Sequence, residues 1–165
     1  MDNIYTAYYC SPIGVVEVKG SLDGIISLYF IEDNISSFET PECLKECITQ
    51  LDEYFKGIRE EFTVKLCVDG TDFRKKVWNK LIDIPYGETR SYMDIADAIG
   101  NKKAVRAVGG ANHNNKISVI IPCHRVVGAN GDLTGYGGGL WRKEWLLNHE
   151  KNIKASRKKN NNIDI

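Results

Sequence analysis

Residues 91–111, SYMDIADAIGNKKAVRAVGGA, decide the architecture of the second half of this chain. Ser91 and Asp94 have the spacing of a helix N-terminal capping box, and apolar residues follow at helical intervals until Gly100 ends the helix. A second short helix is expected from about Lys102 through Ala111. Two short helices joined by a tight glycine turn predict a helix-turn-helix.

The second helix has mostly small side chains, and Arg106 is the one long side chain in its middle. Ala107 and Gly110 would let the backbone approach a narrow surface closely. This composition favours the minor groove of DNA, with one inserted side chain, over base reading in the major groove. Two small helices packed tightly together would show the same composition, so both interpretations stay open on this helix alone.

On the C-terminal side, the apolar run ISVII at 117–121 predicts a buried strand that ends at Pro122. Cys123 and His124 follow directly, ahead of a glycine-rich loop at 128–139. A thiolate is the reactive form of cysteine, and a neighbouring imidazole lowers the pKa of a thiol. A Cys-His pair also needs a group that orients the ring, and Glu150 at the end of an expected helix is the carboxylate candidate.

The N-terminal part predicts a three-stranded antiparallel meander, because three β-rich runs are separated by the turn sequences SPIG and SLDG. A helix over 44–55, stopped by Gly57, and a further strand at 62–68 complete this part. It contains no catalytic motif, so a mainly structural role is expected. The three β-rich runs are residues 4–10, 14–20 and 25–31.

The fold class is therefore α+β. We expect an N-terminal antiparallel-sheet domain over residues 1–68 and a helical C-terminal domain with the helix-turn-helix over 69–150. Residues 151–165 are basic and rich in asparagine, without periodicity, and predict a disordered tail.

The net charge of zero hides a division between the two halves of the chain. Residues 1–66 contain 5 Lys and Arg against 12 Asp and Glu, a net charge of −7. Residues 67–165 contain 17 against 10, a net charge of +7. Such asymmetry suggests that the second half meets a polyanion, although two oppositely charged domains would also simply attract each other.

Several classes are excluded by composition. No apolar run approaches the ~20 residues of a membrane span, and the N-terminus lacks the pattern of a signal peptide. A cytoplasmic protein with reduced thiols is expected, associated with the nucleoid when bound to DNA, or nuclear in a eukaryote. Five cysteines without zinc-ribbon spacing, and no histidine before His113, predict no metal site. His113 and His149 are expected to be surface residues.

The sequence resembles the O6-alkylguanine-DNA alkyltransferases, also called methylated-DNA–protein-cysteine methyltransferases. The resemblance covers nearly the whole chain and is densest between Thr71 and Glu150. The most specific segments are VWNKLIDIPYGETRSYMDIA, RAVGGA, IIPCHRVV, GDLTGYGGG and KEWLLNHE. It implies a ribonuclease H-like N-terminal domain and a monomer that needs no cofactor. It also implies a suicide methyltransferase that binds duplex DNA in the minor groove, regardless of sequence, and flips out O6-alkylguanine.

The resemblance also implies a role for each matching residue. Cys123 is the alkyl acceptor, His124 deprotonates it through a bridging water, and Glu150 orients the histidine. Tyr92 protonates the departing guanine, and Asn115 supports the turn between the DNA-binding helix and the acceptor. Arg106 fills the vacated stack, with Ala107 and Gly110 beside it on the DNA-binding helix. The implied base pocket consists of Val126, Tyr136, Gly137 and Gly138.

Two departures and two rival classes remain. Lys116 stands where the family usually has proline, and Arg74 where it commonly has glutamine. Alkyltransferase-like proteins bind lesions without repair because their acceptor cysteine is replaced, and the presence of Cys123 argues against that class. A cysteine hydrolase would use Cys123, His124 and Glu150, but the sequence shows no oxyanion hole and the helix-turn-helix would be unexplained.

Overall fold

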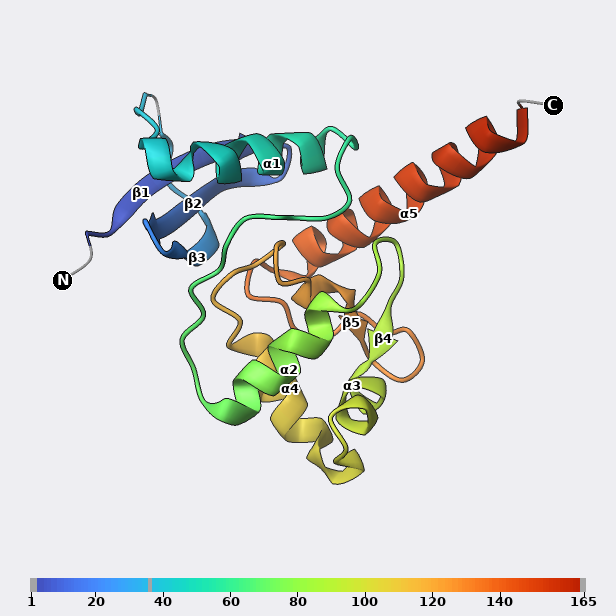
Figure 1. Ribbon diagram of the computed structural model, residues 1–165. Coiled ribbons are helices and arrows are strands. Elements are labelled where there is room, and N and C mark those ends of the chain that lie inside the picture. The colour runs from blue at the N-terminus through green and yellow to red at the C-terminus, as the bar shows by residue number, and fades with distance from the viewer. Residues whose placement is uncertain (1–2, 36, 164–165) are drawn as a thin grey trace.

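The computed structural model describes residues 3–35 and 37–163. Its N-terminal domain contains a three-stranded antiparallel sheet in chain order, which confirms the predicted meander. Helix α1 (Lys45–Phe55), preceded by the short 3-10 helix η1 (Glu42–Leu44), packs over this sheet (Figure 1). The strands are β1 (Tyr5–Ser11), β2 (Gly14–Ser21) and β3 (Gly24–Ile31).

The strand expected at 62–68 does not form, and that prediction is wrong. This segment meets the sheet at a single parallel bridge between Ile25 and Leu66. The Ile25 amide donates to the Lys65 carbonyl, and the Cys67 amide donates to the Ile25 carbonyl. The alternating apolar side chains pack against the core without a paired ladder, so alternation here marks one-sided burial of an extended connection.

The C-terminal domain is mainly helical, and its first two helices begin at side-chain caps. Thr71 Oγ1 accepts from the Arg74 amide, and Ser91 and Asp94 make both hydrogen bonds of the predicted capping box. Helices α3 and α4 form the helix-turn-helix that the sequence predicts. The elements are α2 (Asp72–Ile82), β4 (Arg90–Ser91), α3 (Tyr92–Ala98), η2 (Lys102–Ala104), α4 (Val105–His113), η3 (Cys123–Arg125), β5 (Val126–Val127) and α5 (Leu140–Ile163).

The segment before the cysteine is buried but is not a strand, contrary to expectation. It folds into turns in which the Ile121 amide donates to the Ile117 carbonyl, and Val119 has a positive φ of 70°. An isolated parallel bridge joins Ile117 to Leu28 of β3, so the N-terminal sheet supports this segment directly. A short apolar run indicates burial alone, and periodicity cannot distinguish a strand from buried turns.

The tail is also a correction, because residues 151–163 continue helix α5. Figure 1 shows the end of this helix projecting from the body, away from the end of the molecule that holds α3 and α4. The first turns of the extension beyond residue 150 contact both domains. The Arg157 guanidinium donates to the Gly57 carbonyl and pairs with Glu60, and Lys154 donates to the Tyr86 carbonyl. Residues 164–165 of the expected tail lie outside the described residues.

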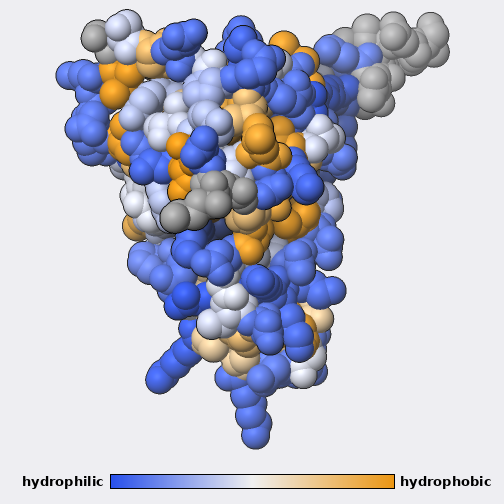
Figure 2. Space-filling model, turned by 60° about the vertical axis from the view of Figure 1, so that its left-hand side comes forward, coloured by the Kyte–Doolittle hydropathy of each residue, from blue (hydrophilic) through white to orange (hydrophobic). Residues whose placement is uncertain are grey.

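The end of the molecule that holds α3 and α4 is largely hydrophilic. Figure 2 shows long hydrophilic side chains reaching outward from it, whereas the larger apolar patches lie higher up the molecule. Within residues 3–35 and 37–163, no helix combines the length and apolar character that a membrane crossing requires.

Candidate active site

Cys123 opens the one-turn helix η3, with only 5% of its surface exposed. The buried side chain of Asn115 holds the turn that leads to it. Asn115 Nδ2 donates to the Ile121 carbonyl at 2.9 Å, and its Oδ1 accepts from the Ile117 amide at 3.0 Å. This amide therefore cross-links the segment that follows α4 to the turn that leads to Cys123.

Glu150 is fully buried on α5 and accepts hydrogen bonds from four different residues. His124 Nε2 lies 2.7 Å from Glu150 Oε2, and the Tyr54 hydroxyl donates to the same oxygen at 2.6 Å. Arg125 donates to both carboxylate oxygens, at 2.8 and 3.0 Å, and the Gly87 amide donates to Oε1 at 3.1 Å. Burial alone would raise the pKa of this carboxyl, but His124 and Arg125 hold the pKa well below its ordinary value.

His124 is fully buried, and burial lowers its pKa even though Glu150 acts in the opposite direction. A neutral ring that donates from Nε2 to Glu150 has its free lone pair on Nδ1. Nδ1 is buried and has no hydrogen-bond partner within the described part of the chain. The ring is therefore held in the tautomer that can accept a proton at Nδ1.

Lys143 is a buried cation that acts on the cysteine, and no sequence pattern indicates it. Its Nζ donates to the Thr134 carbonyl at 2.6 Å and to the Gly135 carbonyl at 3.4 Å. Burial lowers the pKa of Lys143 to about 8, partly offset by Cys123. Burial also raises the pKa of the Cys123 thiol, while a hydrogen bond from Asn115 and the charge of Lys143 oppose that rise.

A cavity of about 160 Å³ opens onto Cys123. Tyr136, Gly137 and Gly138 border it as expected, whereas Val126 is fully buried in β5 and is not among the bordering residues. The N-terminal domain also contributes to this wall, so its role is not purely structural. The remaining bordering residues are Tyr29, Phe30, Asn112, His113, Asn115, Ser118 and Gly135.

Helix α4 presents two different faces. Val108 and Ala111 are buried toward α2, where Trp78 Nε1 donates to the Ala111 carbonyl at 2.8 Å. Arg106, Ala107 and Gly110 are exposed, and a Cβ added at Gly110 would meet open space. The small residues thus serve close packing on one side and leave an uncrowded outer surface on the other.

Tyr92, at the N-terminus of α3, links this surface to the glycine-rich loop. Its hydroxyl accepts from Thr134 Oγ1 at 3.0 Å and lies 3.4 Å from the Thr134 carbonyl. Gly109 of α4 faces the Tyr92 ring without crowding it, since an added Cβ would lie 4.0 Å away. Tyr92 therefore connects the start of α3 to the glycine-rich loop that borders the cavity.

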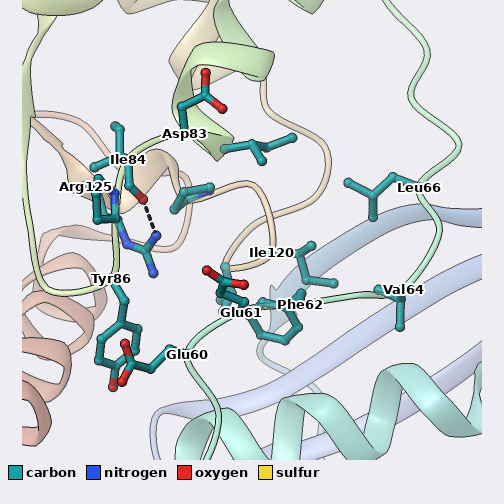
Figure 3. Close-up of a pocket in the computed structure, with 14 residues that line it drawn as sticks. Glu60, Glu61, Phe62, Val64, Leu66, Asp83, Ile84, Tyr86, Ile120 and Arg125 are labelled. Carbon is teal, nitrogen blue, oxygen red and sulfur yellow. Dashed lines mark hydrogen bonds between the residues drawn. The ribbon is translucent and has the colours of Figure 1, made fainter.

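A larger cavity of about 400 Å³ lies behind the acceptor segment, between the 60–66 connection and the end of α2 (Figure 3). Arg125 reaches one side of it and donates to the Ile84 carbonyl, the contact marked in Figure 3. Phe62 and Ile120 give it apolar walls, but Cys123 does not border it. The chemistry therefore belongs to the smaller cavity.

Comparison with known proteins agrees with this geometry. Two family models match the chain: 6-O-methylguanine DNA methyltransferase, ribonuclease-like domain, over residues 4–68, and its DNA binding domain over 72–152. A Methanosarcina acetivorans methylated-DNA–protein-cysteine methyltransferase is 50% identical over 153 residues, which cover 89% of this chain and 98% of that protein. The chain belongs to this methyltransferase family.

Solved structures of family members share the fold. The Mycobacterium tuberculosis O6-methylguanine methyltransferase is 45% identical, with a TM-score of 0.81 over 92% of this chain and 94% of that one. The Mycobacterium tuberculosis OGT in complex with DNA is 47% identical, with a TM-score of 0.81 over 91% and 93% of the two chains. The predicted α+β class, the DNA-binding domain and the assignment to the methyltransferases are confirmed.

The structure also identifies polar residues at the site that the sequence interpretation left out. Arg125 and Tyr54 share the carboxylate of Glu150, and Asn112 borders the cavity. Arg125 could have been suspected, because it lies within the PCHRV motif. Tyr54 is 96 residues from Glu150 in the chain, and no local pattern reveals such a contact. His149 is not a free surface residue, because it stacks on Trp145 and bonds the Tyr54 carbonyl.

Proposed function

We propose that this methyltransferase repairs O6-alkylguanine in duplex DNA by moving the alkyl group irreversibly to its own Cys123. The observation that carries the proposal is a buried cysteine at a small cavity, followed directly by a histidine bonded to a buried carboxylate. Arg106, Ala107 and Gly110 form an exposed strip on α4, only a few residues before Asn112, which borders this cavity.

In the proposed reaction, the Cys123 thiol passes its proton through a bridging water to His124 Nδ1. The carboxylate of Glu150 keeps the ring oriented through Nε2 and stabilises the imidazolium that results. The thiolate attacks the alkyl carbon, so a carbon–sulfur bond forms while the bond from that carbon to O6 breaks. The departing guanine takes its proton from the Tyr92 hydroxyl. No metal or cofactor takes part in this displacement.

The DNA-binding step follows from the outer surface of α4. Ala107 and Gly110 allow the helix to approach the minor groove, and Arg106 occupies the space that the flipped nucleotide leaves in the stack. Ala107 and Gly110 have no polar side-chain atom that could form a hydrogen bond with a base edge, which suits repair in any sequence context. Extrusion of a nucleotide costs a few kcal/mol, and it costs least at a damaged pair.

A thioether at Cys123 has no route back to a thiol within this site, so each molecule acts once. The flipped base lies against Tyr136, Gly137 and Gly138, with its alkyl group toward the sulfur. Asn115 keeps the acceptor turn in register with α4. The protein acts as a monomer on duplex DNA, and we propose O4-alkylthymine as a second substrate.

Mass spectrometry of the intact protein after incubation with O6-methylguanine duplex tests the proposal. We expect a gain of one methyl group per molecule, with the label mapped to the peptide that contains Cys123. Cys123→Ala should abolish the transfer and still bind the duplex. A label on Cys10, Cys43, Cys47 or Cys67 would overturn the assignment of the acceptor.

The rival function, a cysteine hydrolase that uses Cys123, His124 and Glu150, makes an opposite prediction about turnover. A hydrolase releases many products per molecule and regains its free thiol. The proposed reaction stops at one alkyl group per protein and leaves the thiol blocked. Counting products against protein over a long incubation therefore separates the two functions.

A further inference from the structure

Asn112 presents a buried hydrogen-bond acceptor that no residue in the described part of the chain uses. The residue lies on the inner face of α4 with 4% of its surface exposed, and it borders the cavity that opens onto Cys123. Its Oδ1 is buried and has no hydrogen-bond partner among residues 3–35 and 37–163. A buried acceptor without a partner is unfavourable, so such an atom at a cavity points to a ligand that supplies a donor.

The orientation of this amide follows from its neighbour. Asn112 Nδ2 faces the carbonyl oxygen of Cys123 at 3.4 Å, the distance of a long hydrogen bond. A rotated amide would bring two carbonyl oxygens together and would lose that contact. Oδ1 is therefore the atom of this amide without a partner among the described residues, while Nδ2 of the same side chain contacts Cys123.

The chemistry of the lesion identifies the donor. Alkylation at O6 removes the proton from ring N1, so ring nitrogens N1, N3 and N7 of the damaged base are then all acceptors, while N9 is bonded to the sugar. The exocyclic 2-amino group is the single donor that O6-alkylguanine retains, and O4-alkylthymine has none. We infer that Asn112 Oδ1 accepts a hydrogen bond from the 2-amino group of the flipped base and so selects O6-alkylguanine. This inference rests on the proposed function.

This one contact with the 2-amino group should discriminate clearly between bases that have the group and bases that lack it. A site that is built to hydrogen-bond a substrate group rejects an analogue without it, because a buried polar group is then left unpaired. The closest analogue is O6-methylhypoxanthine, which has the same ring and the same methyl group but lacks the 2-amino group. It isolates the proposed contact with the least change of shape.

The test compares two duplexes of one sequence, with O6-methylguanine or O6-methylhypoxanthine opposite cytosine. Single-turnover methylation of the full-length protein is measured at saturating DNA. Wild type should prefer the guanine lesion by about tenfold, which corresponds to about 1.4 kcal/mol. Asn112→Leu, which is close in shape and has no acceptor, should reduce that preference to less than about twofold. Asn112→Ala should do the same without adding apolar bulk.

Comparison of ratios removes the other effects of the substitution. Loss of the Nδ2 contact with Cys123 changes the rates on both substrates alike, and so does any general loss of stability. The different energies of flipping the two bases belong to the DNA and cancel between wild type and variant. His113→Ala is the matched control, since His113 follows Asn112 on α4 and borders the same cavity. It should leave the preference unchanged.

Each result decides the matter. A preference that survives in both Asn112 variants, or that His113→Ala abolishes equally, overturns the inference. Equal rates on the two lesions in wild type also overturn it, while the proposed function stands. Absence of methyl transfer from O6-methylguanine to wild type is a different failure, because it refutes the proposed function itself.

Discussion

Arg106 is the side chain whose role is most open to direct measurement. It is exposed on α4 beside Ala107 and Gly110, which have small side chains or none and leave the surface around it open. If its guanidinium holds the place of the flipped nucleotide, Arg106→Ala should slow repair in duplex DNA by roughly ten- to a thousandfold, or about 1.4–4 kcal/mol. Reaction with the free O6-alkylguanine base should hardly change, because no flipping is needed.

The control for Arg106 is a neighbouring cation that cannot act as a wedge. Lys103→Ala removes an exposed positive charge just before α4, so it should weaken DNA binding while the rate at saturating duplex stays at the wild-type value. If Arg106→Ala behaves in the same way, Arg106 is a phosphate contact and the wedge role is wrong.

Burial of His124 makes a prediction about pH. Burial lowers the pKa of this imidazole in the folded protein, whereas in the unfolded chain the pKa is about 6.5. Below that pH the unfolded state binds a proton that the folded state refuses, so stability should fall as the pH falls, until the lower folded pKa is reached. His124→Gln should flatten this slope by up to about 1.4 kcal/mol per pH unit.

Urea unfolding of wild type and His124→Gln at several pH values between 8 and 5 measures that slope. Equal slopes in the two proteins would show that the imidazole has the same proton affinity folded and unfolded. That result would also remove the argument that His124 is held neutral with Nδ1 free.

The chemistry at the residue scale was predictable where it is local in sequence. Cys123 and His124 are adjacent, and the motif around them is specific, so the sequence alone is enough to propose them as the reactive pair. Glu150 was found as a carboxylate near the end of a helix, and the structure bonds it to His124. The unpaired acceptor of Asn112 was not predictable, because it depends on which carbonyl its amide meets after folding.

Elements with strong local signals were predicted well. The meander forms at turns where Gly14 and Gly24 adopt positive φ, and α3 begins at its predicted capping box. The wrong predictions share a physical cause. Residues 62–68 and 117–121 are apolar and buried, but their backbone partners come from distant segments such as β3 and supply only isolated bridges. The apolar composition of a segment indicates that it will be buried, but it does not indicate which distant segment its backbone will pair with.

The extension of α5 makes a prediction at the scale of one element. Ile153 packs so closely over Gly57 that an added Cβ would lie 2.6 Å from Ile153 Cδ1, and Gly57 also has a φ of +77° that favours glycine. Arg157 bonds the Gly57 carbonyl at 2.6 Å. A chain that ends at Asn152 loses these contacts. Its free energy of unfolding should fall by about 2–3 kcal/mol, from one partly buried isoleucine and the hydrogen bonds. Urea unfolding measures this loss.

A second truncation provides the control for α5. A chain that ends at Lys159 keeps Ile153, Lys154 and Arg157 and should match the stability of the full chain. If the chain that ends at Asn152 is as stable as the full chain, the contacts of the extension do not contribute to the free energy of unfolding. The composition of the tail predicts disorder because its partners, which lie just after α1 and at Tyr86, are far away in sequence.

The charge of the whole molecule is distributed unevenly between its two domains, with the negative charge in the first and the positive charge in the second. The acidic N-terminal half and the basic C-terminal half should turn the helix-turn-helix end toward DNA. Figure 1 places the basic extension of α5 away from α3 and α4, so this segment lies far from that end of the molecule. We therefore expect the helix-turn-helix end to set the orientation on DNA and the extension to add only to the net charge.

Salt dependence of duplex binding tests this arrangement. The short α4 leaves room for about three to five phosphate contacts, so log Kd against log salt should have a slope of magnitude roughly 3–4.5 by counterion release. Lys103→Ala should lower that magnitude by about 0.9, because it removes one contact beside α4. Lys158→Ala, on the projecting end of α5, removes the same charge and should leave the slope unchanged. A slope that drops equally in both variants would show that net charge, and not the helix-turn-helix surface, governs binding.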